Sequence, residues 1–208
     1  CNTYGALSKN NNDPQGAYRP FDKQRSGFVI GEGAGIVVME SVKRAKKRGA
    51  NILGFISGYG TSCDGVDRIN CASDGKELAR AIIMALSDAA VNADEIGYIS
   101  LDGLAVDLWD NSEIKALQLV FGDNLKKIPL SCPKSMFGNL LGASGVVDMI
   151  IALLAMEHNL VPPTLNLDTP VLNGINYVAK EAREYKVSKS LIISRGRGGI
   201  NSVLVVEK

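Results

Sequence analysis

The fold is decided by the stretch Lys134-Ser135-Met136-Phe137-Gly138-Asn139 and by what lies on either side of it. The stretch continues through two leucines into Gly142-Ala143-Ser144-Gly145. Before it, residues 128–132 form a short apolar run that predicts a buried strand. After it, residues 143–154 are apolar and predict a helix that is buried on most sides. A strand, a glycine-containing junction and a buried helix are typical of an α/β protein.

A second junction of the same kind lies earlier in the chain. Residues 98–101 predict a buried strand that delivers Asp102 at its C-terminal end, and residues 111–121 predict the helix that follows. The other apolar patterns predict strands at residues 36–40 and 52–56, helices at 41–48 and 75–90, and a closing hairpin of residues 191–193 and 203–206. Strands and helices alternate, so the predicted class is α/β.

The first 26 residues differ from the rest because they are rich in Asn, Asp, Pro and Gly. The side chains of Asn and Asp compete for backbone hydrogen bonds, so residues 1–26 predict a loop-rich leading segment on the surface. The sequence itself contains no visible internal repeat.

Composition excludes several classes of function. The 208 residues are 46% apolar and 22% charged, which is typical of a soluble globular protein. Lys and Arg (23) nearly balance Asp and Glu (22), so nucleic acid is not expected as a partner. The basic residues 43–48 predict the solvated end of a helix closed by Gly49, with contact to an acidic carrier protein as the alternative. With no run of about 20 apolar residues and no secretory signal, we expect no membrane span and a cytoplasmic location.

Metal binding is not expected either. The four cysteines show no CxxC spacing, and His158 is the only histidine in the chain. A zinc site needs about four such ligands, so we expect free thiols instead. His158 follows an apolar helix and is predicted to lie near its C-terminus, where a partial positive charge is favourable.

Several ordered blocks of this sequence resemble one family. The chain is similar to the C-terminal half of β-ketoacyl synthases, which condense acyl thioesters with malonyl thioesters. The blocks are Arg19-Pro20-Phe21-Asp22, residues 27–35, residues 45–50, Asp102-Gly103 with Asp110 and Glu113, residues 134–145, and residues 161–166. The resemblance implies a five-layered αβαβα thiolase-like fold, of which residues 1–208 supply the C-terminal half. It also implies a complementary N-terminal half, for which we expect a second polypeptide.

Two positions depart from the family pattern. The family frames read HGTGT and KSxxGHxxGAxG, and their histidines help to decarboxylate the malonyl group and hold the enolate oxygen. This chain has Asp102 and Asn139 at those positions. A carboxylate repels an enolate, and an amide is a weaker donor than imidazole. The sequence therefore predicts a preserved scaffold with vestigial active-site positions.

The neighbours of these positions are assigned partly from the resemblance and partly from the charges that the residues carry. Lys134 and Glu113 are expected to form a buried structural ion pair. Asp102 is expected to cap the turn at Gly103, or alternatively to pair with Lys134 or Arg197. Arg195 and Arg197 stand where active synthases have phenylalanines, one of them the gate over the nucleophile, and Arg197 is expected to plug the site by pairing with Asp102.

The branch that the chain resembles most is the chain-length factor of type II polyketide synthases. Residues 194–202 read Ser-Arg-Gly-Arg-Gly-Gly-Ile-Asn-Ser, a run of the kind found in that branch. The resemblance implies a non-catalytic subunit that pairs with an active ketosynthase and shapes the polyketide tunnel. It implies no cofactor of its own, because the growing chain is carried on the phosphopantetheine of a partner acyl carrier protein.

Two alternatives stay open at this stage. The chain could belong to an active β-ketoacyl synthase with unorthodox Asp and Asn groups, in which Asn139 donates to a thioester carbonyl. It could also be an N-terminal-nucleophile hydrolase, in which Cys1 attacks and its own α-amino group acts as the base. The ordered blocks favour the first family over the second.

Overall fold

A computed structural model describes residues 5–208, so Cys1 lies outside the described residues. The strands are β1 (Phe55–Cys63), β2 (Tyr98–Ser100), β3 (Leu130–Ser131), β4 (Leu160–Val161), β5 (Arg183–Glu184), β6 (Lys189–Gly196) and β7 (Ile200–Glu207). The α-helices are α1 (Val42–Lys47), α2 (Lys76–Asp88), α3 (Asp107–Phe121), α4 (Lys134–Phe137) and α5 (Ser144–His158). Short 3-10 turns lie at η2 (Ala93–Glu95), η3 (Gly122–Lys126) and η4 (Leu141–Ala143).

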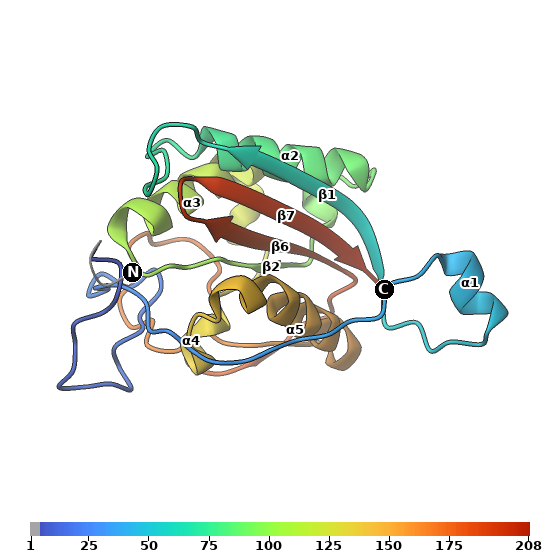
Figure 1. Cartoon of the computed structure of the whole chain (residues 1–208), viewed down its shortest axis with the longest axis horizontal. Helices are drawn as coiled ribbons and strands as arrows, with labels where there is room; N and C mark the ends of the chain where they lie inside the picture. Colours follow the sequence, from blue (N-terminus) through green and yellow to red (C-terminus); the bar gives the residue numbers. More distant parts are fainter. Residues whose placement is uncertain (1–4) are drawn as a thin grey trace.

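One mixed sheet organises the described chain. Its strand order is β1-β7-β6-β2-β3, with β1, β7 and β6 antiparallel and β6, β2 and β3 parallel. Helices α2 and α3 cover one face and α5 covers the other (Figure 1). The predicted α/β class is confirmed, and β4 and β5 form a separate short pair at the end of α5.

Each face of the sheet has its own apolar core. The larger core joins α2 and α3 to the sheet through residues such as Leu78, Ile82, Ile99 and Leu191. The second core packs Met149, Ala152 and Met156 of α5 against the other face. The helix predicted at residues 75–90 is confirmed as α2, and its apolar residues Leu78, Ala81, Ile82, Ala85 and Leu86 form one buried stripe.

Glycine lets α2 approach the sheet closely. A Cβ at Gly58 would lie 2.1 Å from the carbonyl oxygen of Ala85, and one at Gly60 would lie 2.0 Å from that of Ala81. No side chain fits at such distances, so β1 passes directly under the backbone of α2.

Four predicted elements differ from the structure. The strand predicted at residues 52–56 begins only at Phe55 and continues to Cys63 as β1. Residues 36–40 form no strand but an extended segment, because no described neighbour pairs with them. Helix α3 begins at Asp107, four residues before the predicted start, since Val106 is extended and can precede the first turn. Helix α5 is not buried on most sides, because only one of its faces lies on the sheet and Leu154 is exposed.

The leading segment is a loop, as predicted, but it is not entirely on the surface. Residues 5–26 form neither helix nor strand, yet Ala17, Tyr18, Phe21 and Asp22 are buried. Asp22 accepts hydrogen bonds from the backbone amides of Gln24, Asp168 and Thr169, which tie this loop to the distant segment before residue 170.

The segment Leu141–His158 is long and apolar enough, by length and composition alone, to cross a membrane. The structure gives it the contacts of a core helix, because Met149, Ala152 and Met156 pack on the sheet. Asp148, in the middle of the segment, is buried against Lys134. His158 is the last residue of α5, as predicted.

Candidate active site

The candidate site lies where three parallel strands end. Asp102 follows β2, Lys134 begins α4 shortly after β3, and Arg195 lies near the end of β6. The carboxyl ends of parallel strands meet at one edge of a sheet, which is the usual place for functional side chains in α/β proteins. The structure therefore brings Asp102 and Lys134, which the sequence placed after two separate strands, to the same edge of the sheet.

Lys134 is the centre of the site and is fully buried, with 0% of its surface exposed. Its Nζ lies 2.6 Å from Oδ2 of Asp148, 3.5 Å from Oδ1 of Asp102 and 3.4 Å from the carbonyl oxygen of Leu101. Burial alone would lower the pKa of Lys134, but the carboxylates of Asp148 and Asp102 raise it above its ordinary value. Lys134 therefore stays an ammonium ion shared by two carboxyl groups.

The expected Lys134–Glu113 ion pair is wrong. Glu113 accepts hydrogen bonds from the backbone amides of Asp102 at 2.8 Å and Gly103 at 3.1 Å. Burial and the negative charge of Asp102 raise the pKa of Glu113. Glu113, and not Asp102, caps the turn after β2, because its position on α3 faces the two amides that the strand end leaves unpaired.

Asp102 does not cap the turn but pairs with Lys134, which was one of the alternatives predicted for it. Its Oδ1 pairs with Lys134 and also accepts a hydrogen bond from the backbone amide of Arg195 at 3.2 Å. The same oxygen thus links the ends of β2, β3 and β6. Asp110 holds the next part of the junction by accepting from the amides of Phe21 and Ala105, and burial raises the pKa of Asp110 to about 7.

Asn139 is buried, and its side-chain oxygen is already in use. Oδ1 accepts hydrogen bonds from the backbone amide of Leu141 at 2.9 Å and from Oγ of Ser144 at 3.1 Å. An amide N–H can only donate, so these contacts fix which side of Asn139 is oxygen. The backbone of Asn139 is also bonded on both sides, to Val29 and Gly31.

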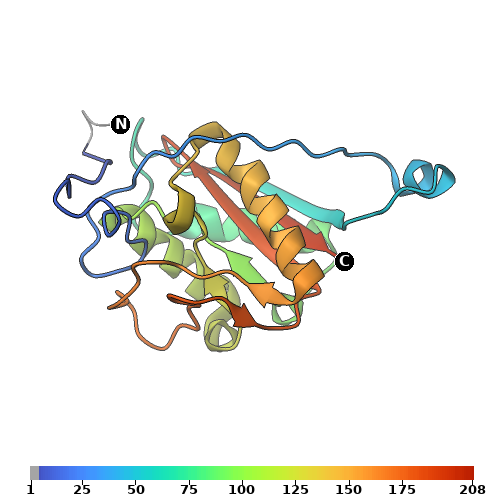
Figure 2. The ribbon, with the colours of Figure 1, turned by 90° about the horizontal axis from the view of Figure 1, so that it is seen from below.

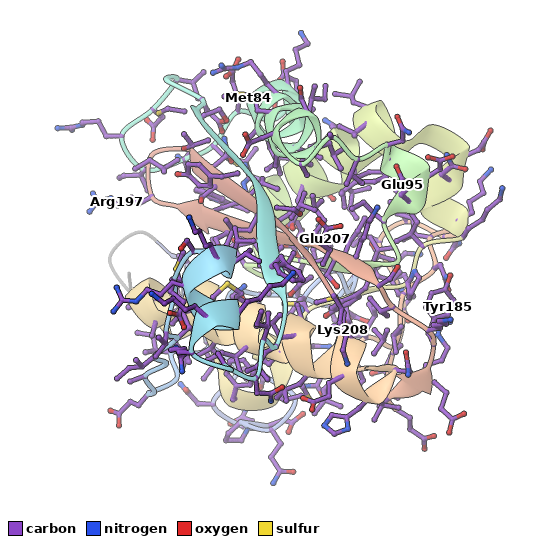
Figure 3. All side chains as sticks on the ribbon, turned by 90° about the vertical axis from the view of Figure 1, so that its right-hand side faces the viewer. Met84, Glu95, Tyr185, Arg197, Glu207 and Lys208 are labelled. Atoms are coloured by element: carbon purple, nitrogen blue, oxygen red, sulfur yellow. The ribbon has the colours of Figure 1, made fainter. Side chains whose placement is uncertain are left out.

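The expected plug, Arg197 with Asp102, is also wrong. Arg197 lies in the turn of the β6–β7 hairpin and is exposed at the edge of the molecule (Figure 3). Arg195 is the buried arginine, because its side chain leaves the last residues of β6 and turns inward. Its guanidinium donates to Asn201, to the carbonyl oxygen of Trp109 and to Ser112, and it stacks 4.8 Å from the centroid of the Trp109 ring.

Arg195 has the carboxylate partner that a buried guanidinium needs. Its Nη2 lies 3.7 Å from Oδ2 of Asp64, and both side chains are almost fully buried. Asp64 in turn accepts from the amide of Ala72 and from Nδ2 of Asn201. This network joins the β6–β7 hairpin, the loop after β1 and helix α3 into one unit.

Asp148, Asp64 and Asn201 were not among the site residues predicted from the sequence. Asp148 had a usable signal, since it is the only charged residue among the apolar residues 143–154. A lone carboxylate on such a helix must find a cation, and Lys134 is the one that it meets. Asp64 and Asn201 had no comparable signal, because both lie in Gly-rich polar runs that are typical of loops.

Cys132 and Cys71, the two buried cysteines of the described chain, are not activated as nucleophiles. Cys132 is buried beside the site, where its Sγ lies 3.6 Å from the carbonyl oxygen of Asp102, and burial raises the pKa of its thiol. Cys71 is likewise buried with a raised pKa, chiefly because of desolvation. Neither thiol has an imidazole to activate it, since the only histidine is at the far end of α5.

The family comparisons agree with this geometry. Residues 53–168 match the model of the beta-ketoacyl synthase C-terminal domain, and residues 1–45 match that of the N-terminal domain. The chain is 42% identical over 205 residues to 3-oxoacyl-[acyl-carrier-protein] synthase 2 of Rhizobium meliloti, and this alignment covers 98% of the chain and 48% of the relative. The chain thus spans about half the length of the curated relatives that it matches.

Solved structures show the same fold. One is a chain from the complex of a type II PKS acyl-carrier protein with its ketosynthase, at a TM-score of 0.94 and 35% identity over 99% of this chain and 51% of that one. Another is the ishigamide ketosynthase/chain length factor, at a TM-score of 0.90 and 35% identity over 99% of this chain and 49% of that one. Because the C-terminal domain model matches more than half of the chain and the strand ends carry the family's junctions, the chain belongs to the β-ketoacyl synthase family and has its thiolase-like fold.

Proposed function

We propose that this chain is part of a non-catalytic subunit, similar to a chain-length factor, that pairs with an active ketosynthase in a type II polyketide synthase. The observation that carries the proposal is the carboxylate of Asp102 at the position of a family histidine. In this proposal the buried contacts around Asp102 stabilise the fold, and the partner ketosynthase carries out the bond-making steps.

Electrostatics make Asp102 unsuited to the family's chemistry. Decarboxylation of a malonyl thioester develops negative charge on an enolate oxygen, which must be met by hydrogen-bond donors. A second negative charge about 4 Å away would oppose that enolate by roughly 4 kcal/mol at an effective dielectric constant of about 20. Lys134 divides its single positive charge between Asp102 and Asp148, so it does not offset the repulsion fully.

The Arg195 network supports the same proposal. Arg195 stands where the family's active members have a phenylalanine, and here its guanidinium is held by hydrogen bonds and by Asp64. A side chain with so many fixed partners cannot swing aside as an apolar gate does. We therefore propose Arg195, instead of Arg197, as the residue that closes the vestigial site.

The proposed partners are an active ketosynthase and an acyl carrier protein whose phosphopantetheine carries the growing chain. Their support is by similarity: the two solved structures named above contain an acyl-carrier protein with its ketosynthase and a ketosynthase/chain length factor. The chain needs no cofactor of its own for this role.

The test is decarboxylation of malonyl-acyl carrier protein by the protein that contains this chain, purified with and without an active ketosynthase. We expect no carbon dioxide release above background without the ketosynthase, and release when it is added. Substantial release without the ketosynthase would support the alternative, an active synthase in which Asn139 donates to the thioester, and would overturn the proposal.

A further inference from the structure

The chain contains a single Asn-Gly pair, Asn173-Gly174, which lies between β4 and β5. The pair forms a turn, and both residues are exposed. Glycine suits position 174 because its φ is +81°, a left-handed backbone conformation that other residues rarely adopt. In Figure 2 the segment between β4 and β5, coloured orange to red, loops out at the lower left of the molecule. The pair therefore lies on an outlying loop that is open to water.

Neither amide of this pair is held by a hydrogen bond. Among the described residues, the side-chain amide of Asn173 has no hydrogen-bond partner, and the backbone amide of Gly174 donates to none. A Cβ placed on Gly174 would meet nothing within 4 Å, so the space around its backbone is open. An exposed and unbonded backbone of this kind changes conformation at little cost in free energy. The Gly174 nitrogen can thus reach the side-chain carbonyl carbon of Asn173.

The two asparagines that precede a serine are held in place instead. Asn201 precedes Ser202 in β7, is 0% exposed, and donates through Nδ2 to three oxygens. Asn111 precedes Ser112 in α3, where Ser112 is 0% exposed and the Asn111 oxygen accepts from Arg25. Strands and helices keep the backbone amides bonded and the backbone fixed. Sequence and local structure therefore both single out Asn173.

We propose that Asn173-Gly174 is a site of spontaneous deamidation, at which Asn173 is converted to a mixture of aspartate and isoaspartate. The deprotonated backbone nitrogen of Gly174 attacks Cγ of Asn173, a C–N bond forms, and the side-chain nitrogen leaves as ammonia. Water then opens the cyclic imide at one of its two carbonyls, which gives aspartate or isoaspartate. The two steps together consume one water and release one ammonia, so water is the only co-reactant.

The modification would change a loop that is anchored at both ends. The amide of Val171 donates to the carbonyl of Phe21 at 2.9 Å, and the carbonyl of Asn176 accepts from the amide of Leu130 at 3.0 Å. Ile175 packs against the larger core between these anchors. Isoaspartate adds a methylene to the main chain of this loop, so we expect it to loosen the anchors, whereas aspartate adds only a charge. The inference does not rest on the proposed function.

The test incubates the protein that contains the full chain, folded, in mildly alkaline buffer and follows its peptides by mass spectrometry. We expect the side-chain –NH₂ of Asn173 to be replaced by –OH at least about tenfold faster than that of Asn201 or Asn111. The change Asn173→Gln should slow the reaction at this position at least about tenfold, because a larger ring must close. The control Asn51→Gln alters an exposed asparagine before Ile52 and should leave the rate at Asn173 unchanged.

A second incubation in urea separates the effect of the fold from that of the sequence. Unfolding should speed the reactions of Asn201 and Asn111, because their backbone amides are released, and should change that of Asn173 little. The gain in mass distinguishes deamidation from isomerisation at Asp74-Gly75, which leaves the mass unchanged. An unmodified Asn173 in the folded protein, whatever happens in urea, would overturn the proposal. So would equal rates at Asn173 and Asn201 before unfolding.

Discussion

Lys134 is the residue on which the interior of the site depends. It is the only cation recorded within ion-pair distance of either Asp102 or Asp148 among the described residues, and all three side chains are buried. A buried pair adds little net stability compared with an apolar pair, but removing one partner leaves an uncompensated charge. The arrangement is therefore sensitive to the loss of a single member.

We predict that Lys134→Met lowers the free energy of unfolding by about 3–5 kcal/mol, because it leaves Asp148 and Asp102 without their cation. The second change Asp148→Leu, made in that background, should recover part of the loss by removing one buried carboxyl. Urea unfolding of the single and double variants measures both effects. The matched control is Lys126→Met, which removes an exposed lysine paired with Asp123 and should change little.

At the scale of elements, the contact between β1 and α2 depends on glycine. We predict that Gly60→Ala lowers the free energy of unfolding by about 1–3 kcal/mol, because its Cβ would overlap the carbonyl oxygen of Ala81. The control is Gly142→Ala, since nothing lies within 4 Å of a Cβ at Gly142. Equal unfolding midpoints for the two variants would show that α2 can move away from β1 at no cost.

The Asp22 carboxylate stabilises the leading loop, and this stabilisation depends on pH. Burial alone would raise the pKa of Asp22, but hydrogen bonds from the amides of Thr169, Gln24 and Asp168 outweigh it and lower the pKa below its ordinary value. A lowered pKa in the folded state means that the stabilisation is complete above about pH 4, the ordinary value, and is lost as pH falls through the lowered pKa.

We therefore predict that Asp22→Asn destabilises the protein by about 2–3 kcal/mol at pH 7, because the new NH₂ group faces amides that can only donate. The variant should also lose stability less steeply than the parent when pH falls below about 4. Unfolding curves at a series of pH values measure both slopes. Parallel slopes for parent and variant would contradict the role given to Asp22.

Across the whole molecule, the sequence predicted the fold class and the order of most elements. Periodicity located α2 and the hairpin of β6 and β7 because their apolar faces are buried within this chain. Residues 36–40 were wrongly predicted as a strand, because their apolar pattern is strand-like but no described residue pairs with their backbone. An apolar pattern alone does not supply the hydrogen-bonded neighbour that a strand needs.

The candidate site was also predicted only in part. Motif spacing brought Asp102, Lys134 and Arg195 to one sheet edge correctly. The partners of each charge were predicted less well, because ion pairs depend on which side chain reaches across from another element. For this reason the partner of Lys134 is Asp148 and not the expected Glu113. The buried arginine likewise pairs with Asp64 and not with the expected Asp102.

A direct test of the proposed non-catalytic role is to measure malonyl decarboxylation for Asn139→Asp in the complete complex with an active ketosynthase and an acyl carrier protein. Aspartate keeps the oxygen that accepts from Leu141 and Ser144 but removes the NH₂ donor, so it separates a structural role from a catalytic one. If the chain is non-catalytic, malonyl decarboxylation and polyketide formation should stay within about twofold of the parent complex. Replacing the histidine of the KSxxGH frame in the partner ketosynthase should lower decarboxylation by about a hundredfold or more. A loss of about tenfold or more from Asn139→Asp in a complex that still assembles would contradict the account, because the chain would then be donating to the reacting thioester.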